Sequence, residues 1–379
     1  MNVSAVICEY NPFHNGHKYQ IDTARAITGC DAVVALMSGN FVQRGDFAFF
    51  DKAVRADAAL SNGADLILEN PALSTLRSAE GYASAAVYTL TALGCVDTLF
   101  FGAECENLPL LTSIAELLAF EGKDFKNGLS CELSKGASFP SARGASVSRI
   151  LGTEAGEALK KPNNLLAIEY IKALIRQKSP IKPLLIKRTG AEHNSNDACG
   201  CIASASYIRD ALSQNDVSAF DFVPEEARNL YQNSNHFISG SVDKGILSAL
   251  AILGRDEIAS APDISEGLHN KIKKECMKHS TLDALVDAVK SKRYAHSRIR
   301  RSLLCAYLKI TADDVLKMPE YIKVLAFNKQ GQAVLNMAKK TASLPVTTNA
   351  SPLMSMPSAM RMWQRELEFD RVYEIFAMR

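Results

Sequence analysis

Short apolar runs alternate with helical stretches through the first half of the chain, and this alternation restricts the fold more than any other feature. Runs typical of buried strands lie at 2–10, 30–39, 64–71, 96–104 and 180–190. Stretches with helical spacing lie between them at 16–28, 51–63, 78–94 and 163–177. Strands that alternate with helices predict an α/β fold with a parallel sheet covered on both faces.

The chain is long enough for two domains, because 379 residues exceed one ordinary core. Strand signals fade after about residue 215, and helical stretches with basic faces continue to Arg379. The polar stretch YQNSNHFISGS places the boundary near 215–240. We expect an α/β domain at 1–215, with a helical insertion at about 105–160, and a mainly helical domain at 216–379.

Composition indicates a globular protein of the cytoplasm. Hydrophobic residues make up 47% of the chain and charged residues 22%, and the net charge of +2 names no partner by itself. Nine scattered cysteines without a CxxC pair favour reduced thiols. Cys199, Cys201 and His193 lack further ligands at zinc spacing, so no metal site is predicted. Without a signal peptide or an apolar run of about 18 residues, no membrane contact is expected.

The segment EYNPFHNGHKYQI, residues 9–21, places His14 and His17 between the first strand and the first helix. Gly16 allows a tight turn there, and a helix N-terminus offers free N–H groups and a partial positive charge that bind anions. Two histidines at this spacing can face the same phosphates and stabilise charge that develops on an α-phosphate. The alternative is a helix start with solvated histidines, but the spacing and position favour a nucleotide site.

A second polar segment, IASASYIR at 202–209, leads into a later helix. The hydroxyls of Ser204 and Ser206, together with Arg209 and the N–H groups of a helix start, would make a clamp for a triphosphate. The alternative is an ordinary helix cap, where serine is common. The first motif upstream favours the clamp.

Together the two motifs resemble the signatures of the HxGH nucleotidylyltransferases, which attack the α-phosphate of ATP and release pyrophosphate. Ser206 stands where the second signature usually has threonine, and it keeps the hydroxyl. Longer stretches resemble the bacterial tRNA(Met) cytidine acetate ligase family over nearly the whole chain: EYNPFHNGH, MSGNFVQRGDFAFFDKAVRADAAL, GADLILENP, FGAE, PNNLLAIEYIKAL and KRYAHSRIRRSLL. Phe47 stands where that family usually has proline, in Gly45-Asp46-Phe47-Ala48, so we expect a looser loop there.

The resemblance implies a Rossmann-like, HIGH-type nucleotidylyltransferase domain followed by a mainly helical tRNA-binding domain. It also implies an enzyme that activates acetate with ATP as acetyl-adenylate and acetylates N4 of the wobble cytidine of elongator tRNA(Met). Mg²⁺ is expected with the ATP, although no acidic cage for it is evident, and no oligomeric state is predicted. Two alternatives are an adenylyltransferase that builds a small cofactor and a non-catalytic ATP-holding RNA-binding module.

The resemblance assigns catalysis to His14, His17 and Lys52. It assigns ATP binding to Ile7, Glu9, Tyr10, Asn11, Phe13, His14, Gly16, His17, Gln20, Gly102, Asn163, Arg188, Ser204, Ser206 and Arg209. Asn164 is an equal candidate for the nucleotide contact of Asn163, and Asn163 alternatively caps its helix. For the proton that the cytidine amine loses, His17 and the leaving AMP are both candidates.

Contacts with tRNA are expected from basic residues on two segments. They are Arg44, Arg55, Lys292, Arg293, Arg298, Arg300 and Arg301. Basic side chains near Tyr294 suit phosphate contacts and stacking on an unpaired base. The alternative for both segments is a solvated basic face of an amphipathic helix.

Overall fold

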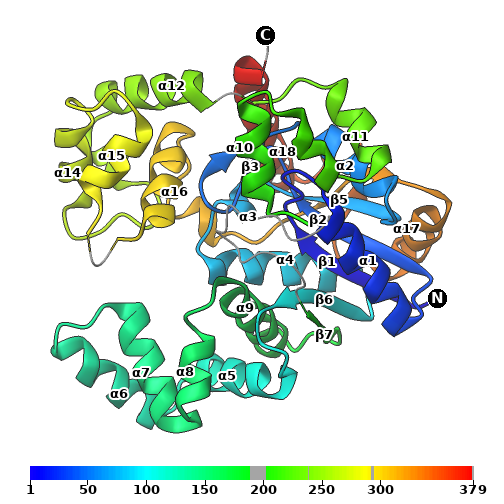
Figure 1. The fold of residues 1–379 in the computed structure, drawn as a ribbon, viewed down its shortest axis with the longest axis horizontal. Helices are drawn as coiled ribbons and strands as arrows, with labels where there is room; N and C mark the ends of the chain where they lie inside the picture. The colour runs from blue at the N-terminus through cyan, green and yellow to red at the C-terminus, as the bar shows by residue number, and fades with distance from the viewer. Residues whose placement is uncertain (188–201, 238, 292–293, 378–379) are drawn as a thin grey trace.

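A seven-stranded sheet forms the centre of the computed structural model, which describes residues 1–187, 202–237, 239–291 and 294–377 (Figure 1). In spatial order the strands are β7 (Lys182–Lys187), β6 (Thr98–Ala103), β1 (Val3–Cys8), β2 (Ala32–Ser38), β5 (Leu66–Asn70), β8 (Ile322–Phe327) and β9 (Val346–Thr347). The five strands from β7 to β5 run parallel, whereas β8 pairs antiparallel with β5. All five predicted strands are therefore present in a parallel arrangement.

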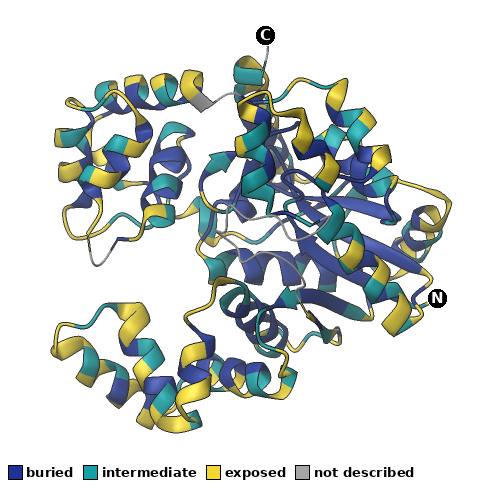
Figure 2. Cartoon of the chain, viewed as in Figure 1, coloured by how far each residue is buried: buried dark blue, intermediate teal, exposed yellow. Residues whose placement is uncertain are grey.

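Helices cover both faces of the sheet, as its apolar strands require. One face carries α1 (Asn15–Thr28), α2 (Lys52–Leu60), α10 (Ala205–Ser213) and α11 (Glu225–Gln232). The other carries α4 (Ala79–Leu93), α9 (Pro162–Arg176) and α17 (Lys329–Thr341). Alternate residues of β1 enter the two apolar clusters, and Figure 2 shows the sheet as the buried centre. None of the helices in the described ranges combines the length and apolarity that a bilayer span needs.

Two helical lobes extend from the sheet on the same side of the molecule (Figure 1). The first comprises α5 (Leu108–Phe120), α6 (Lys123–Ser134), α7 (Phe139–Leu151) and α8 (Thr153–Ala158), where the sequence places an insertion. The second comprises α12 (Ser239–Ile252), α13 (Arg255–Ala259), α14 (Leu268–Glu275), α15 (Leu282–Val289) and α16 (His296–Tyr307). This second lobe has an apolar cluster of its own, which also includes the C-terminal helix α18 (Pro357–Ala377).

The mainly helical region after residue 215 also contributes two strands to the sheet. Residues of β8 pair with β5 from Leu66 to Glu69, and β9 extends the sheet beyond β8. The sequence does not predict the run IKVLAF as a strand, because helical patterns surround it and its partner β9 has two residues only. The sheet takes strands from both sides of residue 215. The domain boundary near that residue therefore stays a prediction.

The segment with the unusual Phe47 forms a short hairpin of β3 (Phe41–Val42) and β4 (Asp46–Phe47). The Phe47 ring stacks on Phe237 with ring centroids 4.9 Å apart, and Tyr373 lies 6.0 Å away in α18. Phe47 is buried. The aromatic contacts hold this hairpin, so the expected loosening of the loop is not what the structure shows.

Candidate active site

The order of strands marks a ligand position between β1 and β6. The chain builds the sheet from β1 through β2 to β5, and then returns to place β6 on the opposite side of β1. In open α/β sheets, ligands bind outside the carboxyl ends of the strands at such a reversal. A cavity lies there, lined by His14, Gly16, His17, Tyr19, Gln20, Gly102, Ile186, Lys187, Ile202, Ala203 and Ser204.

The two histidines build the start of α1 with their own rings. Nδ1 of His14 accepts the N–H of Gly16 at 3.1 Å, and Nδ1 of His17 accepts the N–H of His14 at 3.3 Å. The two rings stack with centroids 3.8 Å apart. Because each Nδ1 is an acceptor, each neutral imidazole carries its proton on Nε2. The cavity therefore has two imidazole N–H donors in its wall.

Close packing holds the rings in this arrangement. A Cβ atom on residue 16 would lie 2.9 Å from Cε1 of His14, so glycine is required at this position. Tyr10 and Phe13 pack against the His17 ring, with centroids 4.8 and 5.6 Å from it. Both aromatic residues are buried. They support the histidines from behind and do not line the cavity themselves.

The second motif approaches the same cavity from α10. Ser204 caps this helix by accepting the N–H of Tyr207 at 3.1 Å, and its hydroxyl lies 3.1 Å from that of Ser206. Nη1 of Arg209 donates to the carbonyl of Asn11 at 2.6 Å, beside the histidine turn. Burial lowers the pKa of Arg209, but a guanidinium remains protonated near neutrality. The start of α10 thus brings hydroxyls and one positive charge to the histidines.

Asn163 and Asn164 differ in burial and in their hydrogen bonds. Oδ1 of Asn164 accepts the N–H groups of Glu104 and Cys105 at 2.9 and 2.8 Å, and Asn164 is buried. Asn163 is more accessible, and Glu104 accepts from its Nδ2 at 2.6 Å. Asn164 of α9 is therefore a structural residue that holds the chain just after β6, which leaves Asn163 as the candidate contact.

Several predicted ATP residues shape the turn rather than line the cavity. Oε1 of Glu9 accepts the N–H of Gln43 at 2.8 Å, and Oδ1 of Asn11 accepts that of Phe49 at 2.7 Å. Ile7 is buried in the sheet. Arg188 lies outside the described residues.

Lining residues that the sequence analysis missed are Tyr19, Ile186, Lys187, Ile202 and Ala203. Two of them had a local signal. Lys187 directly precedes the predicted Arg188 at the end of β7, and Ile202 opens the second motif. Tyr19 lies on α1, and the packing of this helix beside β7 brings it to the cavity.

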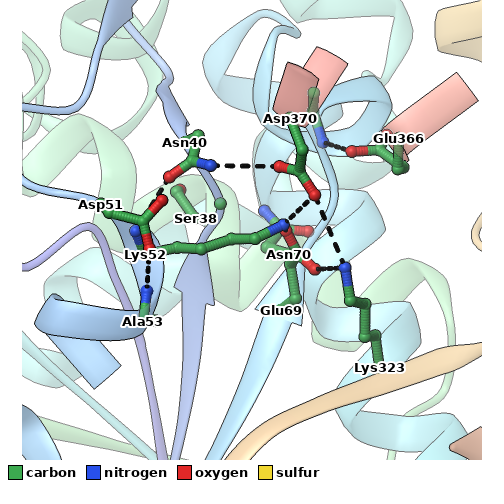
Figure 3. Close-up of polar contacts among 12 residues, drawn as sticks. Ser38, Asn40, Asp51, Lys52, Ala53, Glu69, Asn70, Lys323, Glu366 and Asp370 are labelled. Atoms are coloured by element: carbon green, nitrogen blue, oxygen red, sulfur yellow. Dashed lines mark hydrogen bonds and ion pairs between the residues drawn. The ribbon is translucent and has the colours of Figure 1, made fainter. Parts of the chain in front are cut away.

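Lys52 does not lie on this cavity but in a network of buried charges beneath α18 (Figure 3). Its Nζ is 2.7 Å from Oε1 of Glu69 and also pairs with Asp370, and its side chain is 12% exposed. Lys323 of β8 contacts the other oxygen of Glu69 at 2.7 Å. Burial opposes the charge of Lys52, yet the two carboxylates outweigh it and raise its pKa. The predicted catalytic role of Lys52 is therefore corrected to a structural one.

Two arginines predicted to contact tRNA are buried. The Arg55 guanidinium donates to four backbone carbonyls, those of Glu9, Ser38, Gly39 and Phe50. Arg301 is 5% exposed and pairs with Asp263. Both arginines hold segments of this chain together, so the prediction of a tRNA contact is corrected for them.

The other predicted tRNA residues occupy the hairpin tip and the accessible side of α16. Arg44 is exposed at the turn between β3 and β4. Arg298 donates to the carbonyl of Asp263 at 2.8 Å and lies over the Tyr294 ring at 4.6 Å. Nη2 of Arg300 donates to Oδ1 of Asp46 at 2.9 Å. Lys292 and Arg293 lie outside the described residues.

Comparison with known proteins finds a family and relatives that match this chain over its full length or nearly so. The family described as HIGH nucleotidyl transferase matches residues 1–379. The tRNA(Met) cytidine acetate ligase of Thermoanaerobacter sp. (strain X514) is 37% identical, and the match covers 99% of this chain and 95% of that protein. The ligase of the same name from Clostridium botulinum (strain Langeland) is 38% identical over 94% of this chain and 92% of its own.

Solved structures are similar over the whole chain as well. The apo crystal structure of Thermotoga maritima TmcAL superposes with a TM-score of 0.92 at 30% identity, and covers 100% of this chain and 95% of that one. The structure of the same protein bound with alpha-thio ATP superposes with a TM-score of 0.90 at 29% identity and the same coverage.

Proposed function

Since this chain belongs to the HIGH nucleotidyl transferase family, and within it to the tRNA(Met) cytidine acetate ligases, we propose that it acetylates tRNA with acetate and ATP. In the first half-reaction, a carboxylate oxygen of acetate attacks the α-phosphate of ATP, which yields acetyl-adenylate and pyrophosphate. In the second, N4 of the wobble cytidine of elongator tRNA(Met) attacks the acetyl carbonyl carbon, and AMP leaves.

The stacked pair of imidazoles is the observation that carries this proposal. His14 and His17 hold N–H donors at the start of α1, where the helix dipole also favours an anion. Donors that are fixed before the reaction stabilise the charge that develops on the α-phosphate. Since both Nδ1 atoms accept hydrogen bonds within the turn, neither ring can reorient without losing one.

The remaining ATP contacts are assigned by their position around the cavity. Ser204, Ser206 and Arg209 at the start of α10 suit the β- and γ-phosphates, because hydroxyl and guanidinium donors bind phosphate oxygens well. Gly102 lines the cavity at the end of β6, where the missing side chain leaves room for the nucleoside. Asn163 is held near this strand end, because its Nδ2 donates to Oε1 of Glu104, the residue that follows β6.

The tRNA would bind along the hairpin tip and α16. Arg44, Arg298 and Arg300 are the accessible or half-buried arginines of this surface. Guanidinium groups suit phosphate contacts, which position a nucleic acid strand without reading its sequence. Arg300 also joins the hairpin to α16 through Asp46.

We place Mg²⁺ with the triphosphate rather than on the protein. Among the described residues, no group of three or more His, Cys, Asp or Glu side chains is arranged for a metal ion. Mg²⁺ keeps several waters and commonly binds through substrate phosphates, so it would enter with ATP. An enzyme that modifies tRNA is assigned to the cytoplasm, where its substrate is.

Exchange between ATP and labelled pyrophosphate tests the first half-reaction. The expected result is exchange that requires acetate and does not require tRNA. Adding tRNA(Met) should then yield N4-acetylcytidine, measured by mass spectrometry of the digested tRNA. A His17→Ala variant should lose the exchange.

Other outcomes point to other functions. Exchange that depends on a phosphorylated small molecule instead of acetate would indicate a cofactor adenylyltransferase. Tight tRNA binding without any exchange would indicate a non-catalytic module. Exchange with acetate but no product on tRNA would leave the activation step intact and remove tRNA(Met) as the acceptor.

A further inference from the structure

The segment that leads into the two histidines belongs to no helix or strand. Residues 9–14 lie between the end of β1 and the start of α1, and all of them except Glu9 are buried. Buried main-chain groups outside regular structure need partners from other parts of the chain. The partners of this segment therefore determine where the two imidazoles lie.

The part of the chain that carries the second motif supplies some of these partners. Nη1 of Arg209 in α10 donates to the carbonyl of Asn11, 198 positions away. Nδ2 of Asn15 donates at 3.3 Å to the carbonyl of Asp221 in η1 (Val217–Phe222), the short helix that follows α10. The distance between the histidines and the serine hydroxyls thus depends on how this part of the chain packs on the turn.

Tyr231 of α11 makes a third contact, which is the most deeply buried of the three. Its hydroxyl accepts the main-chain N–H of Phe13 at 2.8 Å. Tyr231 is 2% exposed and Phe13 is 0% exposed. Among the described residues, no other group accepts this N–H. Without the hydroxyl, the amide of Phe13 would have to move or remain without a partner in the core.

Aromatic packing fixes the position of the Tyr231 hydroxyl. The ring stacks on Phe50 with centroids 4.3 Å apart and an angle of 12° between the planes. Burial raises the pKa of Tyr231, so the hydroxyl keeps its proton near neutral pH. A hydroxyl on a stacked, buried ring is a neutral acceptor with a fixed position.

Phe13 transmits this position to the histidines in two ways. Its carbonyl is bonded to the main-chain nitrogen of His14, whose N–H is the group that Nδ1 of His17 accepts. Its ring also packs on the His17 ring, with centroids 5.6 Å apart. A displacement of Phe13 therefore moves the His17 ring through both contacts. The cavity lining does not include Tyr231, so an effect of this residue on ATP passes through the turn.

We infer that Tyr231 is a positioning residue for acetate activation: through the N–H of Phe13, its hydroxyl sets where the two imidazoles present their Nε2 protons to the α-phosphate. The inference rests on the proposed function. Tyr231 exchanges no proton and forms no bond in the reaction. A group that is misplaced by about 1 Å can cost about 10²-fold in rate, so loss of this contact should lower turnover more than ATP affinity.

Tyr231→Phe tests the inference, because it removes the acceptor and keeps the ring that stacks on Phe50. Tyr373→Phe is the matched control. The Tyr373 hydroxyl is also buried and also bonds a distant main-chain group, the carbonyl of Ala48 at 3.1 Å. Phenyllactate in place of Phe13 replaces the N–H by an ester oxygen, so it deletes the donor instead of the acceptor. It provides the same test if Tyr231→Phe does not fold.

Two properties are measured at a temperature where each protein is folded. One is the pair of constants kcat and KM for ATP in acetate-dependent pyrophosphate exchange. The other is the set of imidazole ¹⁵N signals of histidine-labelled protein, in which His14→Gln and His17→Gln variants assign the two signals.

The expected result is a selective loss of turnover. Tyr231→Phe should lower kcat about 10–100-fold and change the KM for ATP by less than about threefold. It should also shift the ¹⁵N signals of His14 and His17. Tyr373→Phe should keep the wild-type kcat and the wild-type signals. In a His17→Gln background, Tyr231→Phe should lower kcat less, because the ring that it positions is absent.

Histidine signals at their wild-type positions in Tyr231→Phe would overturn the inference, and so would an unchanged kcat. Equal losses of kcat in the two tyrosine variants would also overturn it, because they would reflect stability alone. A higher KM at unchanged kcat would place Tyr231 in ground-state binding of ATP instead. If the wild-type protein shows no exchange with acetate, the proposed function fails, and the histidine signals still decide whether Tyr231 positions the rings.

Discussion

Nδ1 of His17 accepts the main-chain N–H of His14, so each ring of this stacked pair has one nitrogen in the turn and one that carries a proton. The two nitrogens can be tested separately. Asparagine at 17 offers an oxygen near the position of Nδ1, whereas glutamine offers an N–H near the position of Nε2. We expect His17→Gln to retain more acetate-dependent pyrophosphate exchange, and His17→Asn to retain more thermal stability.

The expected size follows from other fixed donors at a reacting oxyanion, whose removal costs about 10²–10³ in rate. His17→Asn should show that loss in kcat of the exchange. The melting temperature, measured on the same preparations, separates the two effects. If His17→Asn exchanged faster than His17→Gln, the Nε2 proton would not be the group that acts on the phosphate.

The neighbouring asparagines should differ in the property they affect. Asn164→Ala removes an acceptor from two main-chain N–H groups in a buried position, so it should destabilise the protein by about 1–3 kcal/mol. Asn163→Ala should raise the KM for ATP in the exchange assay with a smaller change in stability. Chemical denaturation of both variants and a titration of ATP check this. Equal KM values would remove Asn163 from the nucleotide site.

Local patterns predict those parts of the fold and site that local sequence determines. Each of the five parallel strands is a continuous apolar run because both of its faces are buried. The histidine turn and the serine cap of α10 are likewise short segments with their own hydrogen bonds. The strand order brings these two segments to one cavity. Their spacing in the sequence indicates that they belong to one site, but it does not give the strand order.

Features that depend on distant partners are not predicted in the same way. Arg55 lies in a segment whose sequence is typical of a solvated basic helix face. Its guanidinium is nevertheless in the core, where it donates to four carbonyls from three segments. Lys52 is misassigned for the same reason, because its partners Glu69 and Asp370 lie 17 and 318 positions away. The local sequence does not show these partners, so it does not distinguish a basic residue that is enclosed by its own chain from one that faces a ligand.

The corrected role of Lys52 predicts a change in stability. Lys52→Met leaves the buried carboxylates of Glu69 and Asp370 with Lys323 as their remaining lysine, so it should cost about 3–5 kcal/mol. Lys160→Met is the control, since its pair with Glu157 is about two-thirds exposed and such pairs contribute about 0–1 kcal/mol. Urea unfolding measures both. A loss of exchange in Lys52→Met at unchanged stability would restore the catalytic assignment.

Glu366 predicts a pH dependence of stability. Burial, together with the charges of Glu69 and Asp370, raises its pKa to about 7, although its oxygens accept the N–H groups of Ala72 and Leu73. The folded protein therefore binds this proton up to about pH 7, whereas an unfolded glutamate loses it near pH 4.5. The stabilising contribution is full below pH 4.5 and is lost as pH rises to about 7.

Glu366→Gln should remove this dependence, because glutamine does not titrate. Relative to wild type, the variant should gain on the order of 3 kcal/mol in unfolding free energy between pH 5 and pH 8. Lys52, Lys323, Glu69 and Asp370 are the same in both proteins, so the difference isolates Glu366. Denaturation at several pH values provides the measurement. Parallel curves for the two proteins would mean that Glu366 is ionised in the folded state throughout.

The contact of Gly45 with α16 predicts that a single methyl group disturbs the link between the hairpin and the second lobe. Gly45 has a φ of 86°, and a Cβ there would meet the backbone of Arg300 and Arg301. Gly136 has nearly the same φ, 84°, with open space around it. Gly136→Ala therefore measures the cost of the backbone conformation alone, about 1 kcal/mol.

Gly45→Ala should cost about 1–3 kcal/mol more than Gly136→Ala, because the hairpin must move away from α16 to accept the methyl group. The same movement displaces Arg44 at the hairpin tip relative to α16, so transfer to tRNA should fall further than acetate-dependent exchange. Thermal unfolding of the two variants, with both half-reactions assayed on each, gives the comparison. Equal costs at the two glycines would mean that the hairpin and α16 separate easily. The contact would then not fix the position of the hairpin relative to α16.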